Sequence, residues 1–260
     1  MKNKNGLSRT IHPTIKEKIR KKSGFACVVC GNALYQYEHV DPEFSEAISH
    51  DPNKMTLLCG TCHDKVTRKI WSKDFIKSKM EKPYSYEFGH VFGDFDFHRN
   101  LIVELGDTKF LNCKNLLTIN NEVIISITEN NSGEKYPPFY LNAKFYDKTG
   151  QDLLEIENNE WKAFSKSWDI IHERKDKITF LEIKGSENEI YLKLIFNPPS
   201  GIKISNLEMI YKNQKISIDK NILKIIGETT TRELILENCK FENFKYAINI
   251  NDQTIELGKS

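Results

Sequence analysis

Four of the six cysteines fall into two closely spaced pairs, Cys27 with Cys30 and Cys59 with Cys62. A Cys-x-x-Cys turn directs two thiolates at one ion, and two such turns complete a tetrahedral four-sulfur zinc site. The 28 residues between the pairs exceed the spacing of a zinc ribbon, so this segment must hold structure of its own. In a reducing compartment the pattern favours a metal over disulfides, and the sequence therefore predicts a structural Zn2+.

Further polar residues follow one another in a fixed order within and just beyond the cysteine pairs. Glu38 and His39 stand together near the end of an alternating run, which Asp41-Pro42 breaks. Asn53 precedes the third paired cysteine, and His63 directly follows the fourth. This order resembles the HNH endonuclease family, and within it the four-cysteine proteins related to bacterial McrA-type restriction nucleases. The resemblance covers about residues 24–70.

The resemblance implies a ββα-metal fold, in which a two-stranded hairpin and a helix hold one divalent ion against the scissile phosphate. By position, His39 is the general base for water, while Glu38 and His63 bind the catalytic ion. Asn53 corresponds to the residue that braces the loop carrying the base. Family members of this type use Mg2+ or a transition metal such as Mn2+ or Ni2+ at this site.

The chemistry of these side chains agrees with the implied roles. A carboxylate and an imidazole leave most positions around an ion open for water and a phosphate oxygen. The pKa of a histidine is ordinarily about 6.5, so His39 can accept a proton near neutral pH. Because alternate strand residues point to opposite faces, the strand must end or twist for Glu38 and His39 to serve one site.

Three positions depart from the family pattern. One is Thr67, four residues after His63, where a further His is common in the family. The middle Asn of the family lies five residues before the third cysteine, where this chain has Lys54, so Asn53 serves only if the loop is shifted. Glu38 stands where Asp is more usual, and its longer side chain moves the carboxylate. His50 and Asp64 are nearby alternative ligands, although an exposed polar side chain is the simpler interpretation of each.

Charge is distributed unevenly along the chain. Residues 1–82 hold 16 Lys and Arg against 9 Asp and Glu, and residues 83–260 hold 22 against 27. The first part therefore has a balance of +7 and the second of −5. A basic segment of this kind can track phosphates, so we expect nucleic acid, DNA in preference to RNA, as the partner. The predicted phosphate contacts are Lys21, Lys22, Lys65, Arg68 and Lys69.

Short helices and one strand are predicted to position these groups. Pro13 can occupy the first turn of a helix that Gly24 stops. Residues 35–40 alternate like a strand, and a second helix is expected over residues 61–70. Ser72 can cap a third helix that ends near Met80.

The chain changes character at Lys82-Pro83, after which short β-branched or aromatic runs alternate with turn residues. The expected strands cover residues 101–105, 123–127, 140–146, 178–183, 190–196 and 202–204. Their spacing favours a β-sandwich. The alternative is a β-solenoid, because Phe110-Leu111-Asn112-Cys113-Lys114-Asn115 is loosely echoed by Leu236-Glu237-Asn238-Cys239-Lys240-Phe241.

The predicted fold class is α+β, with a zinc-stapled HNH domain over residues 1–82 and an all-β domain over residues 83–260. The β-rich part is expected to serve in targeting, sensing or oligomerisation, through a protein partner or a second copy. No stretch approaches the ~20 apolar residues of a membrane span, and the N-terminus lacks the apolar core of a secretory signal, so we expect a cytoplasmic protein without a membrane partner.

Two function classes remain open. The first is a metal-dependent endonuclease that hydrolyses phosphodiester bonds, in bacterial defence or restriction. The second is a catalytically inactive zinc module that binds nucleic acid or a protein. A pure binding module needs the cysteines but not Glu38, His39 and His63.

Overall fold

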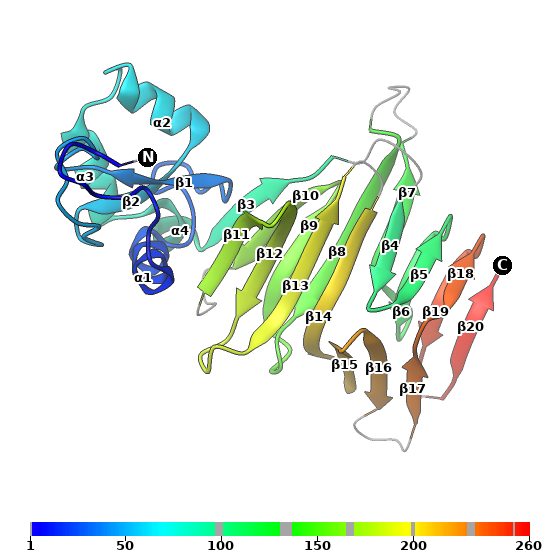
Figure 1. The fold of residues 1–260 in the computed structure, drawn as a ribbon. Coiled ribbons are helices and arrows are strands. Elements are labelled where there is room, and N and C mark those ends of the chain that lie inside the picture. The colour runs from blue at the N-terminus through cyan, green and yellow to red at the C-terminus, as the bar shows by residue number, and fades with distance from the viewer. Residues whose placement is uncertain are drawn as a thin grey trace. The chain divides into compact units, whose positions relative to one another are not determined.

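The computed structural model describes residues 2–96, 101–130, 137–164, 169–198, 201–227, 232–251 and 253–260. Within them the chain is α+β and consists mostly of strands (Figure 1). An N-terminal four-cysteine module precedes large β-sheets that do not close into barrels, which confirms the predicted class at this level. Of the helices in the described residues, none combines the length and the apolar character that a membrane crossing requires.

Contacts divide the chain into two compact units. Unit 1 comprises Met1–Gly93 and Ala163–Ile170, and unit 2 comprises Asp94–Lys162 and Ile171–Ser260. Unit 1 thus extends beyond residue 82 and includes a segment from the β-rich half. The functional division into a nuclease domain and an accessory domain stays a prediction.

Unit 1 is built on a short hairpin with helices before and after it. Its helices are α1 (Pro13–Ser23), α2 (Gly60–Thr67), α3 (Lys73–Glu81) and α4 (Tyr84–Phe88). Strands β1 (Tyr35–His39) and β2 (Met55–Cys59) pair antiparallel, with Tyr35 opposite Cys59 and His39 opposite Met55. Residues that face each other across such a pair share one face of the hairpin.

The predicted helix boundaries hold for two of the three helices. Pro13 begins α1, and Gly24 ends it with a left-handed φ of 68°. The Ser72 hydroxyl caps α3 by accepting from the Phe75 N–H at 3.1 Å. The helix expected over residues 61–70 is shorter, because Lys69 adopts a left-handed φ of 59° and the Ile70 N–H turns back to the Lys65 carbonyl at 2.9 Å.

The hairpin separates two small apolar clusters. On one face Ile19 of α1 packs with Met55 and Leu57 of β2. On the other face Leu58 packs with Val66 of α2 and with the paired cysteines. Every residue of β2 is buried, which fits a strand covered on both faces.

The β-rich part contains two large sheets. One has the order β20-β19-β6-β7-β8-β9-β10-β3, and the other follows β11 to β17 in sequence. To this second sheet β4 is added by pairing with β14, β5 by pairing with β4, and β18 by pairing with β5. All six predicted runs lie wholly or largely in strands. The bounds are β3 (His90–Asp94), β4 (Ile102–Leu105), β5 (Thr108–Leu111), β6 (Asn115–Ile119), β7 (Glu122–Glu129), β8 (Phe139–Tyr146), β9 (Asp152–Glu157), β10 (Glu160–Phe164), β11 (Asp169–Lys175), β12 (Ile178–Lys184), β13 (Ile190–Asn197), β14 (Gly201–Tyr211), β15 (Gln214–Asp219), β16 (Ile222–Gly227), β17 (Glu233–Leu236), β18 (Lys240–Glu242), β19 (Tyr246–Ile250) and β20 (Ile255–Lys259).

The sequence echo corresponds to parallel strand pairing, but in a different alignment. Phe110 of β5 stands opposite Phe241 of β18, and their rings stack at 5.2 Å. The Asn112 amide donates to the Asn243 side-chain oxygen at 2.7 Å. Leu236, which the sequence comparison set against Phe110, ends β17 instead. The later copy contains two successive five-residue units, LENCK and FENFK, and the second of them forms the pair.

Candidate metal centre

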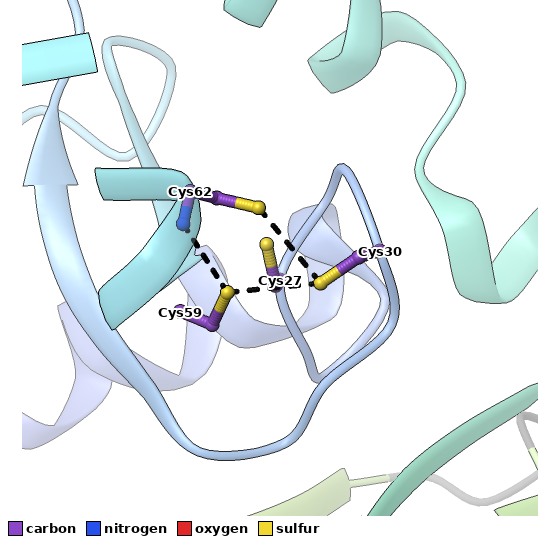
Figure 2. Close-up of side chains that lie close together, drawn as sticks. All are labelled: Cys27, Cys30, Cys59 and Cys62. Carbon is purple, nitrogen blue, oxygen red and sulfur yellow. Dashed lines mark hydrogen bonds between the residues drawn. The ribbon is translucent and has the colours of Figure 1, made fainter. Parts of the chain in front are cut away.

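The four paired cysteines converge on one point (Figure 2). Their sulfur atoms all lie within 4.8 Å of one another. The Cys30 sulfur lies 3.7 Å from that of Cys59 and 3.9 Å from that of Cys62. Four thiolates at the usual Zn–S distance of about 2.3 Å stand about 3.8 Å apart in a tetrahedron. The donor set and its spacing therefore fit a structural Zn2+.

The position of Cys59 at the start of helix α2 favours binding of a cation by the four cysteines. Cys59 ends β2 and caps α2, where its sulfur accepts from the Cys62 N–H at 3.5 Å. Such a position at a helix N-terminus favours a thiolate. The hydrogen bond from Cys30 lowers the pKa of Cys27 to about 5, whereas burial raises the pKa of Cys62 to about 12. Four thiolates therefore require a bound cation to coexist.

Glu38 and His63 come together from the hairpin and the following helix. The Glu38 Oε2 lies 3.1 Å from the His63 Nε2, and both side chains are partly buried. Two neighbouring ligands of an octahedral ion at about 2.1 Å stand about 3.0 Å apart, so this pair fits a shared divalent ion. The second carboxylate oxygen of Glu38 accepts from Lys73 of α3 at 2.7 Å.

His39 lies at the end of β1 and makes its contacts elsewhere. Its ring is largely buried, and its Nε2 lies 3.1 Å from the Nδ1 of His50. The ring of Phe44 covers it at 5.3 Å. Burial lowers the pKa of His39, and the neighbouring His50 lowers this pKa further, which keeps His39 neutral at pH 7 and above. A neutral imidazole is the form that a general base requires.

Asn53 and Lys54 are arranged differently from the family pattern. The exposed Asn53 side chain accepts a hydrogen bond from Lys22. The main chain of Lys54 holds the residue after His39, because its carbonyl accepts from the Val40 N–H at 2.9 Å. A backbone bond of this kind can brace the loop with any residue at position 54.

Four of the five predicted phosphate contacts make contacts within the protein. Lys21 pairs with Glu17 at 2.8 Å, and Arg68 pairs with Asp64 at 2.9 Å. Lys22 donates to Asn53, and the Lys65 ammonium lies 4.4 Å from the centre of the Trp71 ring. Lys69 is exposed at the end of α2. Their role in binding phosphates stays a prediction.

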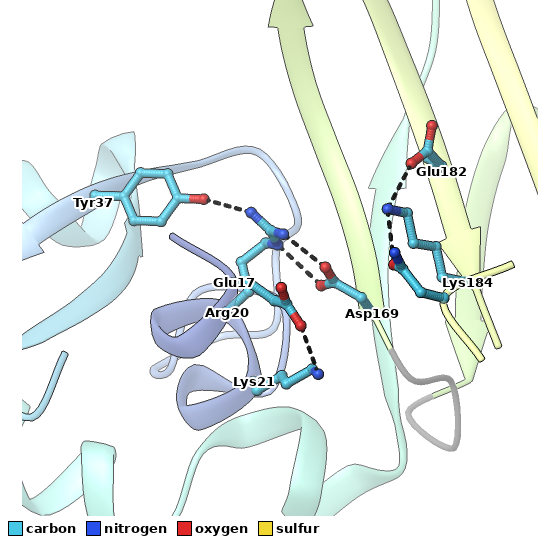
Figure 3. A network of polar contacts seen from close by, with 8 residues as sticks. Glu17, Arg20, Lys21, Tyr37, Asp169, Glu182 and Lys184 are labelled. Atoms are coloured by element: carbon cyan, nitrogen blue, oxygen red, sulfur yellow. Dashed lines mark hydrogen bonds and ion pairs between the residues drawn. The ribbon is translucent and has the colours of Figure 1, made fainter. Parts of the chain in front are cut away.

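The structure adds a buried ion pair that sequence reasoning missed. Arg20 of α1 donates from Nε and Nη2 to Asp169 at 2.9 and 2.6 Å, and from Nη1 to the Tyr37 hydroxyl at 3.1 Å (Figure 3). Burial by itself would lower the pKa of Arg20, but the bonds and charge of Asp169 outweigh it and raise this pKa. The partners are 149 positions apart, and no motif links them.

Among the described residues, the four cysteines form the one cluster of three or more His, Cys, Asp or Glu side chains close enough to share an ion. The geometry of the four cysteines thus supports a zinc site, whereas a catalytic ion at the Glu38–His63 pair stays a prediction. No family model, curated protein or solved structure matches the chain.

Proposed function

We propose that unit 1 is a metal-dependent endonuclease of the HNH type that hydrolyses phosphodiester bonds, with DNA as the favoured substrate and defence or restriction in the cytoplasm as its setting. The approach of Glu38 to His63 at 3.1 Å carries this proposal. These residues belong to the hairpin and to helix α2, whose N-cap and first turn carry two of the four cysteines. A structural Zn2+ would therefore fix the geometry of the hydrolytic pair.

Each side chain has a distinct task in this proposal. Glu38 and His63 would hold Mg2+, Mn2+ or Ni2+, which when bound stabilises charge on the phosphate and on the leaving oxygen. His39 stays neutral in its buried position and takes a proton from the attacking water. Lys73 holds the Glu38 carboxylate in place from α3. The basic residues of the unit neutralise substrate phosphates.

A plasmid-nicking assay tests the proposal. The wild type is expected to cleave with Mg2+ or Mn2+ and to be inactive with EDTA. His39→Ala should lower the rate by about 10²–10⁴-fold, since it removes the base. The matched control is His12→Ala, which removes an exposed histidine. Equal activity of His39→Ala and the wild type, at equal zinc content, would contradict the assigned base.

The second candidate is a zinc module that binds nucleic acid without cutting it. One contact favours it, because the Lys73 ammonium bonds to Glu38 and would compete with a metal ion for this carboxylate. A binding module predicts that Glu38→Gln retains wild-type affinity in gel shifts at two salt concentrations, and that no metal ion supports cleavage by the wild type. The nuclease predicts cleavage by Asp74→Asn, which alters an exposed carboxylate on α3, but not by Glu38→Gln.

For the β-rich part we infer a sandwich rather than a solenoid, with a targeting, sensing or oligomerising role. Long antiparallel ladders such as β12–β13 and β14–β15 support the sandwich. Side chains also meet between the sheets, where Tyr146 of β8 stacks on Tyr211 of β14 at 4.5 Å. Light scattering measures the molar mass of the full chain and so tests the oligomerising role. A monomeric mass at micromolar concentration would contradict that role.

A further inference from the structure

Two histidines and a backbone carbonyl form a chain of hydrogen bonds beside the proposed base. The His39 Nε2 lies 3.1 Å from the His50 Nδ1. The other nitrogen of the same ring, the His50 Nε2, lies 2.9 Å from the carbonyl oxygen of Ser8. Among the described residues, no hydrogen-bond partner is found for the His39 Nδ1.

The Ser8 carbonyl, which ends this series of hydrogen bonds, determines which ring nitrogens carry a hydrogen. A carbonyl oxygen only accepts, so the His50 Nε2 must donate to Ser8. In a neutral His50 ring the Nδ1 then has a lone pair and accepts. The His39 Nε2 must therefore carry the hydrogen of the next bond, which leaves the lone pair of neutral His39 on its Nδ1.

Besides its contact with His39, the loop that carries His50 is held by the N-terminal segment. Asn3 donates from its side chain to the carbonyls of Phe44 and Ala47 at 2.5 and 2.7 Å. These bonds hold the loop that leads to His50. The Arg9 guanidinium lies 4.5 Å from the centre of the Phe44 ring, which in turn covers His39. Asn3 and Arg9 thus hold the loop that carries His50.

We propose that His50 is a positioning residue that holds neutral His39 in its Nε2–H tautomer, so that the His39 Nδ1 is the proton-accepting atom of the site. The catalytic consequence rests on the proposed nuclease function, whereas the tautomer is a property of the folded protein alone. His50 does not need to touch substrate or metal for this role.

Nitrogen chemical shifts of the histidine rings test the tautomer directly. The full-length, zinc-loaded protein is labelled with 15N-histidine and measured at pH 8, with His39 assigned from its missing signals in His39→Asn. We expect the Nε2–H pattern for His39 in the wild type. An Nδ1–H pattern in the wild type would overturn the proposal, whatever the variants do.

Two variants of His50 separate positioning from packing. His50→Phe fills the space without an acceptor and should release His39 to a mixture of tautomers. His50→Asn places a side-chain oxygen near the former Nδ1 and should restore the Nε2–H form. An unchanged tautomer in a His50→Phe protein with native zinc content would contradict the positioning role.

Cleavage kinetics test the consequence for the reaction. We expect His50→Phe to lower kcat by about 10- to 100-fold with little change in KM, and His50→Asn to recover most of the loss. Equal kcat in His50→Phe and the wild type would overturn the role in the reaction. If the wild type cleaves nothing, the nuclease proposal fails, and the NMR result still decides the tautomer.

Discussion

The two units are stabilised in different ways. Unit 1 has two small apolar clusters separated by a hairpin, a four-cysteine cluster and a buried ion pair. Unit 2 buries large apolar side chains on the strands of its sheets, among them Trp161, Phe110 and Phe145. Polar groups thus gather in the unit that has the smaller apolar clusters. A metal ion bound by the four cysteines would supply stabilisation that unit 2 obtains from apolar burial.

Zinc removal should separate the two units most strongly. A structural Zn2+ contributes about 10–16 kcal/mol, as much as the whole stability of many domains. We expect a strong chelator, or Cys59→Ser, to unfold unit 1 while unit 2 keeps its strands. Hydrogen exchange with mass spectrometry on the full chain would show fast exchange in residues 13–82 and continued protection in β12–β14. Equal loss of protection in both regions would contradict the expectation that only unit 1 depends on zinc.

The ion pair of unit 1 should have the next largest effect. Arg20→Met leaves the Asp169 carboxylate buried without its partner, which costs about 3–5 kcal/mol. Urea unfolding of the zinc-loaded protein measures this cost. The control is Lys21→Met on the same helix, whose more exposed pair with Glu17 contributes at most about 1 kcal/mol.

A double variant then distinguishes charge pairing from packing. Arg20→Met combined with Asp169→Leu removes both charges and should recover much of the lost stability, because no buried charge is left unpaired. If Arg20→Met is no more destabilising than Lys21→Met, the buried ion pair does not contribute to the stability of unit 1, and the difference between the two units would then depend on zinc alone.

The sequence was most informative where the chemistry is local. The four cysteines were predicted to share one ion because each Cys-x-x-Cys pair is fixed by its own turn, and the cluster is confirmed. Caps at Gly24 and Ser72 were also predicted from neighbouring residues. The roles of Glu38, His39 and His63 stay predictions, although the fold brings Glu38 and His63 together.

Contacts between distant residues were beyond sequence reasoning. Asp169 follows Arg20 by 149 positions, and nothing in the local pattern of either residue distinguishes it from a surface charge. His50 was interpreted as an exposed polar side chain, because its bond to Ser8 depends on how the N-terminal segment folds back. The sequence similarity around Phe110 was visible. Two successive later segments, LENCK and FENFK, could each be aligned with it, and the structure pairs the second, with Phe241 opposite Phe110.

The smallest effect is expected from a surface ion-pair network in unit 2. Lys148 contacts Glu189 and lies 3.1 Å from Glu208. The hydrogen bond from Lys148 lowers the pKa of Glu189. The pair therefore stabilises the fold fully at pH values above the ordinary pKa of glutamate. This stabilisation is lost as the pH falls through the lowered pKa of Glu189. We expect Lys148→Met to return the pKa of Glu189 toward about 4.3, as followed by carbon NMR of its carboxyl group.

Salt and a matched variant make this last test specific. Added NaCl should raise the pKa of Glu189 in the wild type, because water and ions screen an exposed pair, whereas the buried Arg20–Asp169 pair should respond little. Lys162→Met removes another exposed lysine of unit 2 and should leave the pKa of Glu189 unchanged. If Lys148→Met instead destabilised unit 2 as much as Arg20→Met destabilises unit 1, unit 2 would also depend on its ion pairs. The contrast between an apolar unit and a polar, metal-dependent one would then fail.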